Sequence, residues 1–125
     1  MQFLRPYGDI AYALLRIVTG FLFACHGAQK LFGWWVTEAR EMPAFVQYGA
    51  GAIELIGGLL VMVGFQTSLA AFLCSGTMAV AYFLAHQKDG LLPIQNHGEP
   101  AALYAFVFLY LATRGDGRLS IGGGV

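Results

Sequence analysis

Long apolar stretches alternate with short polar breaks along this chain. Four stretches reach or approach the roughly 20 residues that an α-helix needs to cross a bilayer core: 10–32, 44–65, 67–86 and 99–113. The fourth is the shortest, and interfacial residues extend its reach. The pattern therefore predicts an all-α fold, an integral membrane four-helix bundle, with residues 1–125 forming one transmembrane domain.

Proline and glycine mark the ends of the predicted spans. Pro43 precedes the second span and Pro100 lies where the fourth begins, as expected of a residue that suits the first turn of a helix or its boundary. Gly64 separates the second span from the third, and Gly115 ends the fourth. The Gly-rich tail, 116–125, is expected to be frayed.

Composition also indicates that the solvent is lipid. Hydrophobic residues make up 58% of the 125 residues and charged residues 11%, with a formal net charge of zero, and the mean hydropathy is +0.63. Soluble domains contain about 25% charged residues, and a small domain needs polar side chains to cover its surface. The absence of net positive charge and of a basic cluster excludes nucleic acid as a partner.

Four spans place both ends of the chain on one side of the membrane. The cations on the side of the termini are Arg5, Arg114 and Arg118, and those on or near the opposite side are Arg40, Lys88 and Lys30. Under the positive-inside rule, this distribution slightly favours cytoplasmic termini.

Ionisable side chains within the spans are the main functional candidates, because they are costly in hydrocarbon. On a helical wheel, Arg16 and Lys30 share one stripe of the first span, with His26 at its flank. Glu54 is at the centre of a face of the second span that is rich in small residues. Small residues let helices approach closely. We expect the two faces to pack along Gly20, Gly27, Gly51 and Gly58.

Depth along the helices predicts an ion pair. At about 1.5 Å per residue, Glu54 lies about 15 Å and Arg16 about 20 Å from the side of the longer loops. An Arg16–Glu54 pair would leave neither charge uncompensated in the membrane. Such a pair either locks the first helix to the second or lines a pocket.

The segment before the fourth span adds polar groups on the same side of the membrane. Asn96 and Glu99 lie where the fourth helix begins, and helix N-termini present free N–H groups and a positive dipole end. His26 and Lys30 face this side as well. We expect these four side chains to converge above the predicted ion pair. The alternative is a solvated, capped connection.

Other kinds of site find little support in the sequence. Cys25 and Cys74 differ in depth by roughly 9 Å, too far for a disulfide. The chain has no His-Glu-x-x-His pattern, phosphate loop or dinucleotide-binding fingerprint. We therefore expect no metal site and no cofactor held by the chain itself.

Three motifs resemble those of the DoxX family, and the resemblance covers about residues 9–114. They are Leu14-Leu15-Arg16-Ile17 followed by His26-Gly27-x-Gln29-Lys30-Leu31-Phe32-Gly33, then Glu54-Leu55-Ile56-Gly57-Gly58-Leu59, and finally Asn96-x-Gly98-Glu99. The resemblance implies a multi-pass protein of the bacterial inner membrane with four helices. It also implies a link to quinone-dependent thiosulfate oxidation or to oxidative-stress complexes that contain a sulfurtransferase.

The resemblance implies a candidate pocket formed by six residues. His26, Glu54 and Glu99 are the candidate catalytic residues, because a histidine or carboxylate can exchange protons. The candidate ligand-binding residues are Arg16, Lys30 and Asn96. With no flavin, haem or iron–sulfur motif, any redox role would use a diffusible quinone or a partner's cofactor.

Three functions follow as alternatives. The first is a redox-linked, oxidoreductase-associated membrane subunit that binds a quinone-like ligand or a small sulfur species. The second is a component of a small-molecule carrier or channel, for which a homo-oligomer would supply further helices. The third is a non-catalytic scaffold for soluble redox or sulfurtransferase partners in oxidative stress. Whether the chain itself catalyses a reaction stays open among these alternatives.

Overall fold

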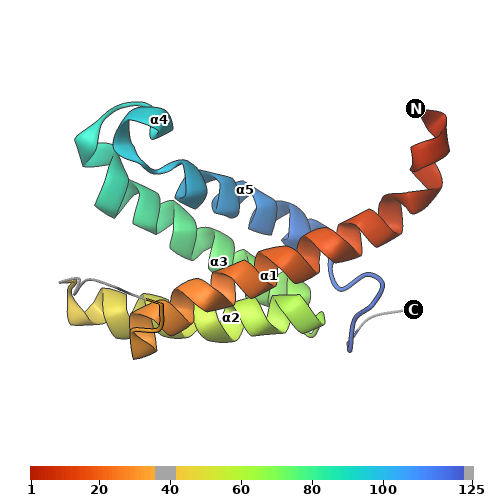
Figure 1. The fold of residues 1–125 in the computed structure, drawn as a ribbon, viewed down its shortest axis with the longest axis horizontal. Coiled ribbons are helices and arrows are strands. Elements are labelled where there is room, and N and C mark those ends of the chain that lie inside the picture. The colour runs from red at the N-terminus through yellow and green to blue at the C-terminus, as the bar shows by residue number, and fades with distance from the viewer. Residues whose placement is uncertain (36–41, 123–125) are drawn as a thin grey trace.

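The computed structural model describes residues 1–35 and 42–122 (Figure 1). Residues 36–41 and 123–125 lie outside this description. They include Arg40, one of the cations used above to compare the two sides of the membrane. In the described ranges the chain is helical, with no strand. The all-α prediction is therefore confirmed.

Four long helical segments lie where the sequence predicts them, with ends that differ by no more than two residues. Helix α1 is Gly8–Phe32, and a 3-10 segment, Gln2–Tyr7, precedes it. A π-helical segment, Phe45–Ala50, leads into α2, Gly51–Val63. The other elements are α3, Thr67–Ala81, its π-helical extension Tyr82–His86, a 3-10 turn Gln87–Asp89, the single-turn α4, Pro93–Asn96, and α5, Glu99–Arg114.

Counted together with the 3-10 and π-helical segments beside them, three helical stretches have the length and hydropathy of membrane spans: Gln2–Phe32, Phe45–Val63 and Thr67–Asp89. Helix α5 has 16 residues, or about 24 Å at 1.5 Å per residue, somewhat less than a hydrocarbon core of about 30 Å. The fourth segment is thus a short helix, and it packs mainly on α3.

The helices form two pairs, α1 with α2 and α3 with α5, joined through contacts between α2 and α3. Figure 1 shows the pairs crossing near the end of the molecule where α5 stops and diverging toward the end that carries α4. Between α1 and α5, the ring of Phe23 lies 4.7 Å from that of Phe108, and both side chains are buried. The outward faces expose apolar side chains such as Phe21, Phe72 and Phe83, which is the surface expected in lipid.

Helices α1 and α2 touch backbone to backbone. A Cβ atom added at Gly20 would lie 2.5 Å from the Met62 nitrogen, and one added at Gly58 would lie 2.6 Å from the Ala24 nitrogen. Gly27 is packed in the same way. At Gly51 the nearest atoms belong instead to side chains, those of Leu31 and Lys30. The predicted close packing is therefore confirmed at all four glycines, through backbone atoms at three of them and through side chains at Gly51.

Candidate functional site

Arg16 is completely buried and is held by backbone carbonyls. Its Nε donates to the Val61 oxygen at 3.0 Å. The other four hydrogen bonds go to the carbonyl oxygens of Met62, Asp116, Arg118 and Leu119, at 2.6–3.4 Å. Because a guanidinium has five N–H donors, these bonds use its full capacity.

The predicted Arg16–Glu54 ion pair is wrong. Arg16 lies level with Val61, which is seven residues, or about 10 Å, from Glu54 along α2. The chain also brings carbonyl oxygens to Arg16 that the sequence pattern did not reveal. The role of Arg16 as a ligand-binding residue stays a prediction, and the geometry instead makes it the point where α1, α2 and the tail meet.

Residues 116–122, which follow α5, are held by hydrogen bonds to the rest of the molecule, so the expectation that the tail frays is wrong for these residues. Ile121 and Gly122 donate backbone hydrogen bonds to the carbonyls of Val63 and Gly64, at 2.9 and 3.0 Å. The Asp116 carboxylate accepts a hydrogen bond of 3.0 Å from the backbone nitrogen of Thr67. The tail therefore closes the turn between α2 and α3 and completes the surroundings of Arg16.

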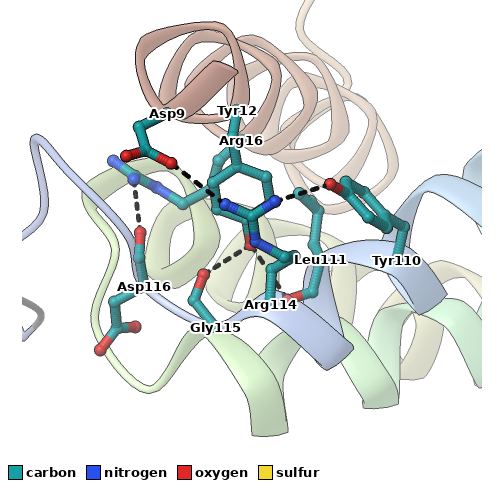
Figure 2. Close-up of polar contacts among 8 residues, drawn as sticks. All are labelled: Asp9, Tyr12, Arg16, Tyr110, Leu111, Arg114, Gly115 and Asp116. Carbon is teal, nitrogen blue, oxygen red and sulfur yellow. Dashed lines mark hydrogen bonds and ion pairs between the residues drawn. The ribbon is translucent and has the colours of Figure 1, made fainter. Parts of the chain in front are cut away.

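A second cluster joins the start of α1 to the end of α5 (Figure 2). The Tyr12 hydroxyl donates to the carbonyl oxygens of Leu111, at 3.2 Å, and Gly115, at 2.5 Å. The Arg114 guanidinium lies 4.6 Å from the centre of the Tyr12 ring and pairs with Asp9 at 3.4 Å. These contacts hold the two helices together at this end of the molecule.

Lys30 and Glu54 form a largely buried ion pair. Lys30 Nζ donates to Glu54 Oε1 at 2.8 Å, and the side chains are 23% and 1% exposed. Among the described residues, Glu54 Oε2 has no hydrogen-bond partner although it is buried. Lys30 comes from the last turn of α1, and its flexible side chain reaches inward from there. Two of the six predicted site residues thus meet in one contact.

Asn96 organises the segment between α3 and α5. Its Nδ2 donates to the Tyr82 hydroxyl at 3.1 Å and to the Gly90 carbonyl at 3.0 Å, and its Oδ1 accepts from the Gly98 nitrogen at 2.8 Å. It is 1% exposed and ends α4, so the expectation that it opens the fourth span is wrong; Gly98 caps α5 instead. Its side-chain bonds fix this connection on the end of α3.

His26 and Glu99 are both exposed and lie in different surroundings. The His26 ring meets the ring of Tyr104 edge-on, with centroids 6.0 Å apart. Glu99 is the first residue of α5. The predicted convergence of four polar side chains above one ion pair is therefore not what the structure shows, because Lys30 pairs with Glu54 and Asn96 binds its own loop.

A groove of about 920 Å³ runs between α1 and α5. Its wall consists mostly of apolar side chains from both helices and from the segment at α4, and its polar lining residues are Thr19, Glu99 and Tyr104. Of the six predicted site residues, only Glu99 lines this groove. Thr19 and Tyr104 were missed, because an apolar helix face that lines a groove has the same sequence pattern as one that faces lipid.

The cysteines and the possible metal ligands do not form a further centre in the described part of the chain. Cys25 and Cys74 are free thiols. A Cβ atom added at Gly57 would come within 2.5 Å of Cys74 Sγ, so Cys74 packs tightly against α2. Within residues 1–35 and 42–122, no group of three His, Cys, Asp or Glu side chains is placed to hold a metal ion.

Three known proteins are similar to this chain over most of its length. The chain is 35% identical to an "Uncharacterized protein" of Haemophilus influenzae, over 97% of this chain and 95% of that protein. It is 32% identical to a Bacillus subtilis protein named "Putative oxidoreductase CatD", over 90% of this chain and 85% of that protein. It is 28% identical to the "Inner membrane protein YqjF" of Escherichia coli, over 94% of each chain. No solved structure matches.

The family comparison covers the helices that carry Arg16, Lys30 and Glu54. The DoxX family model matches residues 11–87, well over half of the chain. Together with the apolar helices, the match makes a lipid bilayer the environment of this protein. The chain belongs to the DoxX family of membrane proteins.

Proposed function

We propose that this protein is a redox-linked membrane subunit that binds a quinone-like ligand in the groove between α1 and α5. The groove itself carries the proposal. Its volume of about 920 Å³ lies within the range of about 300–1,000 Å³ typical of small-molecule sites. Ligand sites are mostly apolar with a few placed polar groups, and the side chains of Thr19, Tyr104 and Glu99 provide these groups here.

A quinone-like ligand suits this groove better than a small sulfur anion. An anion needs cationic or N–H partners, and the two candidate cations are engaged elsewhere. Arg16 binds five carbonyls, Lys30 binds Glu54, and neither lines the groove. A quinone, which is a flat, apolar ring with two oxygens, needs no cationic partner. The name of the Bacillus relative, which is that of an oxidoreductase, supports a redox role in the same direction.

The same proposal includes place and partners. We place the chain in the bacterial inner membrane with cytoplasmic termini, supported by the name of the Escherichia relative and by the arginines near the termini. The chain holds no redox group of its own in this proposal, so electrons reach the quinone through a soluble partner. Reporter fusions at the tail and in the 87–92 segment test the orientation, with activity of a cytoplasmic reporter expected only at the tail.

The binding experiment uses decylubiquinone and the purified protein in detergent. A ligand at 100 times its Kd stabilises the folded state by about 2.7 kcal/mol, which appears as a rise in the unfolding temperature. Leu22→Trp fills the groove and should weaken binding at least tenfold. Leu69→Trp is the matched control, because Leu69 is an exposed leucine on α3 outside the groove. If decylubiquinone has no effect, or if both variants bind equally, the groove is not the quinone site.

A further inference from the structure

The polar groups that line the groove differ in what they can offer a ligand. Within the described residues, Glu99 is the only charged side chain of the lining. It is exposed, and no described residue forms a hydrogen bond or an ion pair with it. Thr19 and Tyr104 contribute hydroxyl groups, each of which can donate or accept. An ionised carboxylate can only accept, so Glu99 is available to a ligand that carries a donor.

Two prolines remove backbone donors from the same end of the groove. Pro93 and Pro100 both belong to the lining and have no N–H group. Pro100 occupies the first turn of α5, where helices otherwise present unpaired N–H groups. The Gly98 N–H, which precedes this turn, is already donated to Asn96 Oδ1 at 2.8 Å. At this end of the groove the two prolines therefore remove donors, while the Glu99 carboxylate adds acceptors.

The two redox forms of a quinone respond differently to such a site. The carbonyl oxygens of a quinone only accept hydrogen bonds, whereas each hydroxyl of the quinol can also donate one. The Tyr104 hydroxyl serves both forms, because a hydroxyl adapts to either partner. A carboxylate can form a hydrogen bond only with the quinol, which has hydroxyl donors, and its lone pairs repel the carbonyl oxygen of the quinone.

We propose that the groove binds a quinol in preference to the corresponding quinone, with the Glu99 carboxylate accepting a hydrogen bond from the ring hydroxyl. The proposal rests on the quinone-binding function above and specifies the redox state that the site selects. The apolar part of the ligand lies along Leu22 and Leu15 toward the middle of the bilayer. Its polar ring then lies at the α4 end of the groove, beside Glu99.

The expected selectivity is about tenfold. A hydrogen bond to a charged group stabilises a complex more than one between neutral groups. Because Glu99 is exposed, we expect its hydrogen bond to contribute a free energy at the lower end of the range for charged groups. Selective binding of one redox form shifts the potential of the bound couple by linkage. Tighter binding of the reduced form raises that potential, by about 30 mV for a tenfold preference in a two-electron couple.

The test measures the affinities of decylubiquinol and decylubiquinone for the intact protein under anaerobic conditions. The wild type should bind the quinol about tenfold more tightly. Glu99→Gln replaces an acceptor with a group that also donates, so the ratio of the two affinities should fall to about one or below. Asp89→Asn is the matched control, since Asp89 is an exposed carboxylate outside the groove, and its ratio should equal that of the wild type.

The outcomes separate this inference from the proposed function. Equal affinities in the wild type, or a preference that survives in Glu99→Gln, overturn the selectivity but leave quinone binding intact. A loss of preference in Asp89→Asn overturns the assignment to Glu99 by attributing it to surface charge. If neither redox form binds the wild type, the proposed function fails and the selectivity with it. The unfolding temperature of each variant shows that it is folded.

Discussion

Replacing Gly20 with alanine tests whether α1 and α2 really touch through their backbones. The added Cβ would lie 2.5 Å from the Met62 nitrogen and 2.6 Å from the Gly58 oxygen, whereas ordinary contacts begin at 3.4 Å. Both neighbours are backbone atoms, which cannot rotate away. The helices must therefore separate by about 1 Å, and a gap of that size forfeits roughly a quarter to a half of each dispersion contact around it.

The expected loss of stability can be worked out from these distances. Overpacking a tight contact costs about 1–3 kcal/mol, and this contact belongs at the upper end. The gain in helix propensity from glycine to alanine returns about 0.5–1 kcal/mol. The net loss is about 2 kcal/mol. For a chain of this size it should lower the unfolding temperature by roughly 8 °C, at about 4 °C per kcal/mol.

Thermal unfolding in detergent, followed by circular dichroism, provides the measurement, and Gly76→Ala provides the control. Gly76 is exposed on α3, and a Cβ atom added there meets no atom within 4 Å. That variant should keep or slightly raise the unfolding temperature, because only the propensity gain of about 0.5–1 kcal/mol applies. If the two variants unfold within 2 °C of each other, the backbone contact between α1 and α2 is refuted.

Three further predictions concern the buried polar contacts. Arg16→Lys has three donors where the native side chain has five, so it should cost about 2–4 kcal/mol by stranding buried carbonyls, and carboxypeptidase should digest the tail faster. Lys30→Met and Glu54→Gln should each destabilise the protein by about 2 kcal/mol, because each single change leaves a partner unpaired. The double variant should therefore lose less stability than the sum of the two single losses. Additive losses in thermal unfolding would contradict the ion pair. Asn96→Ala should speed amide hydrogen exchange in α4 without changing exchange in α1, and unchanged protection of α4 would show that its three side-chain bonds do not hold that turn.

The pattern of apolar stretches predicts the helices well, because the lengths of the stretches and the prolines and glycines at their ends both constrain where helices lie. The left-handed glycine at Gly64, with φ of 73°, ends α2 where the sequence indicates a break. The stripes of glycine also predict the α1–α2 contact, since a residue without a side chain on a buried face has few other uses. These features depend on positions close together in the sequence, and the pattern displays them directly.

The polar contacts were harder to predict, because a charge can be compensated by groups that have no signature. Side-chain types suggest that Arg16 should seek a carboxylate, yet carbonyl oxygens satisfy it and every residue carries one. Lys30 looked like a rim residue and reaches Glu54 through its length. The groove was not foreseen because Leu15 and Leu103 look like lipid-facing residues whether or not another helix lies opposite.

The carbonyl surroundings of Arg16 have a consequence for the order in which the protein is made. Arg16 enters the membrane with the first helix to be synthesised, but one of its partners, the Leu119 carbonyl, lies 103 residues further along the chain. At about 5–20 residues per second, ribosomes need roughly 5–20 s to reach it. During that interval the guanidinium must be kept hydrated or held by the insertion machinery. The first helix therefore reaches its final environment only after the last one has been translated.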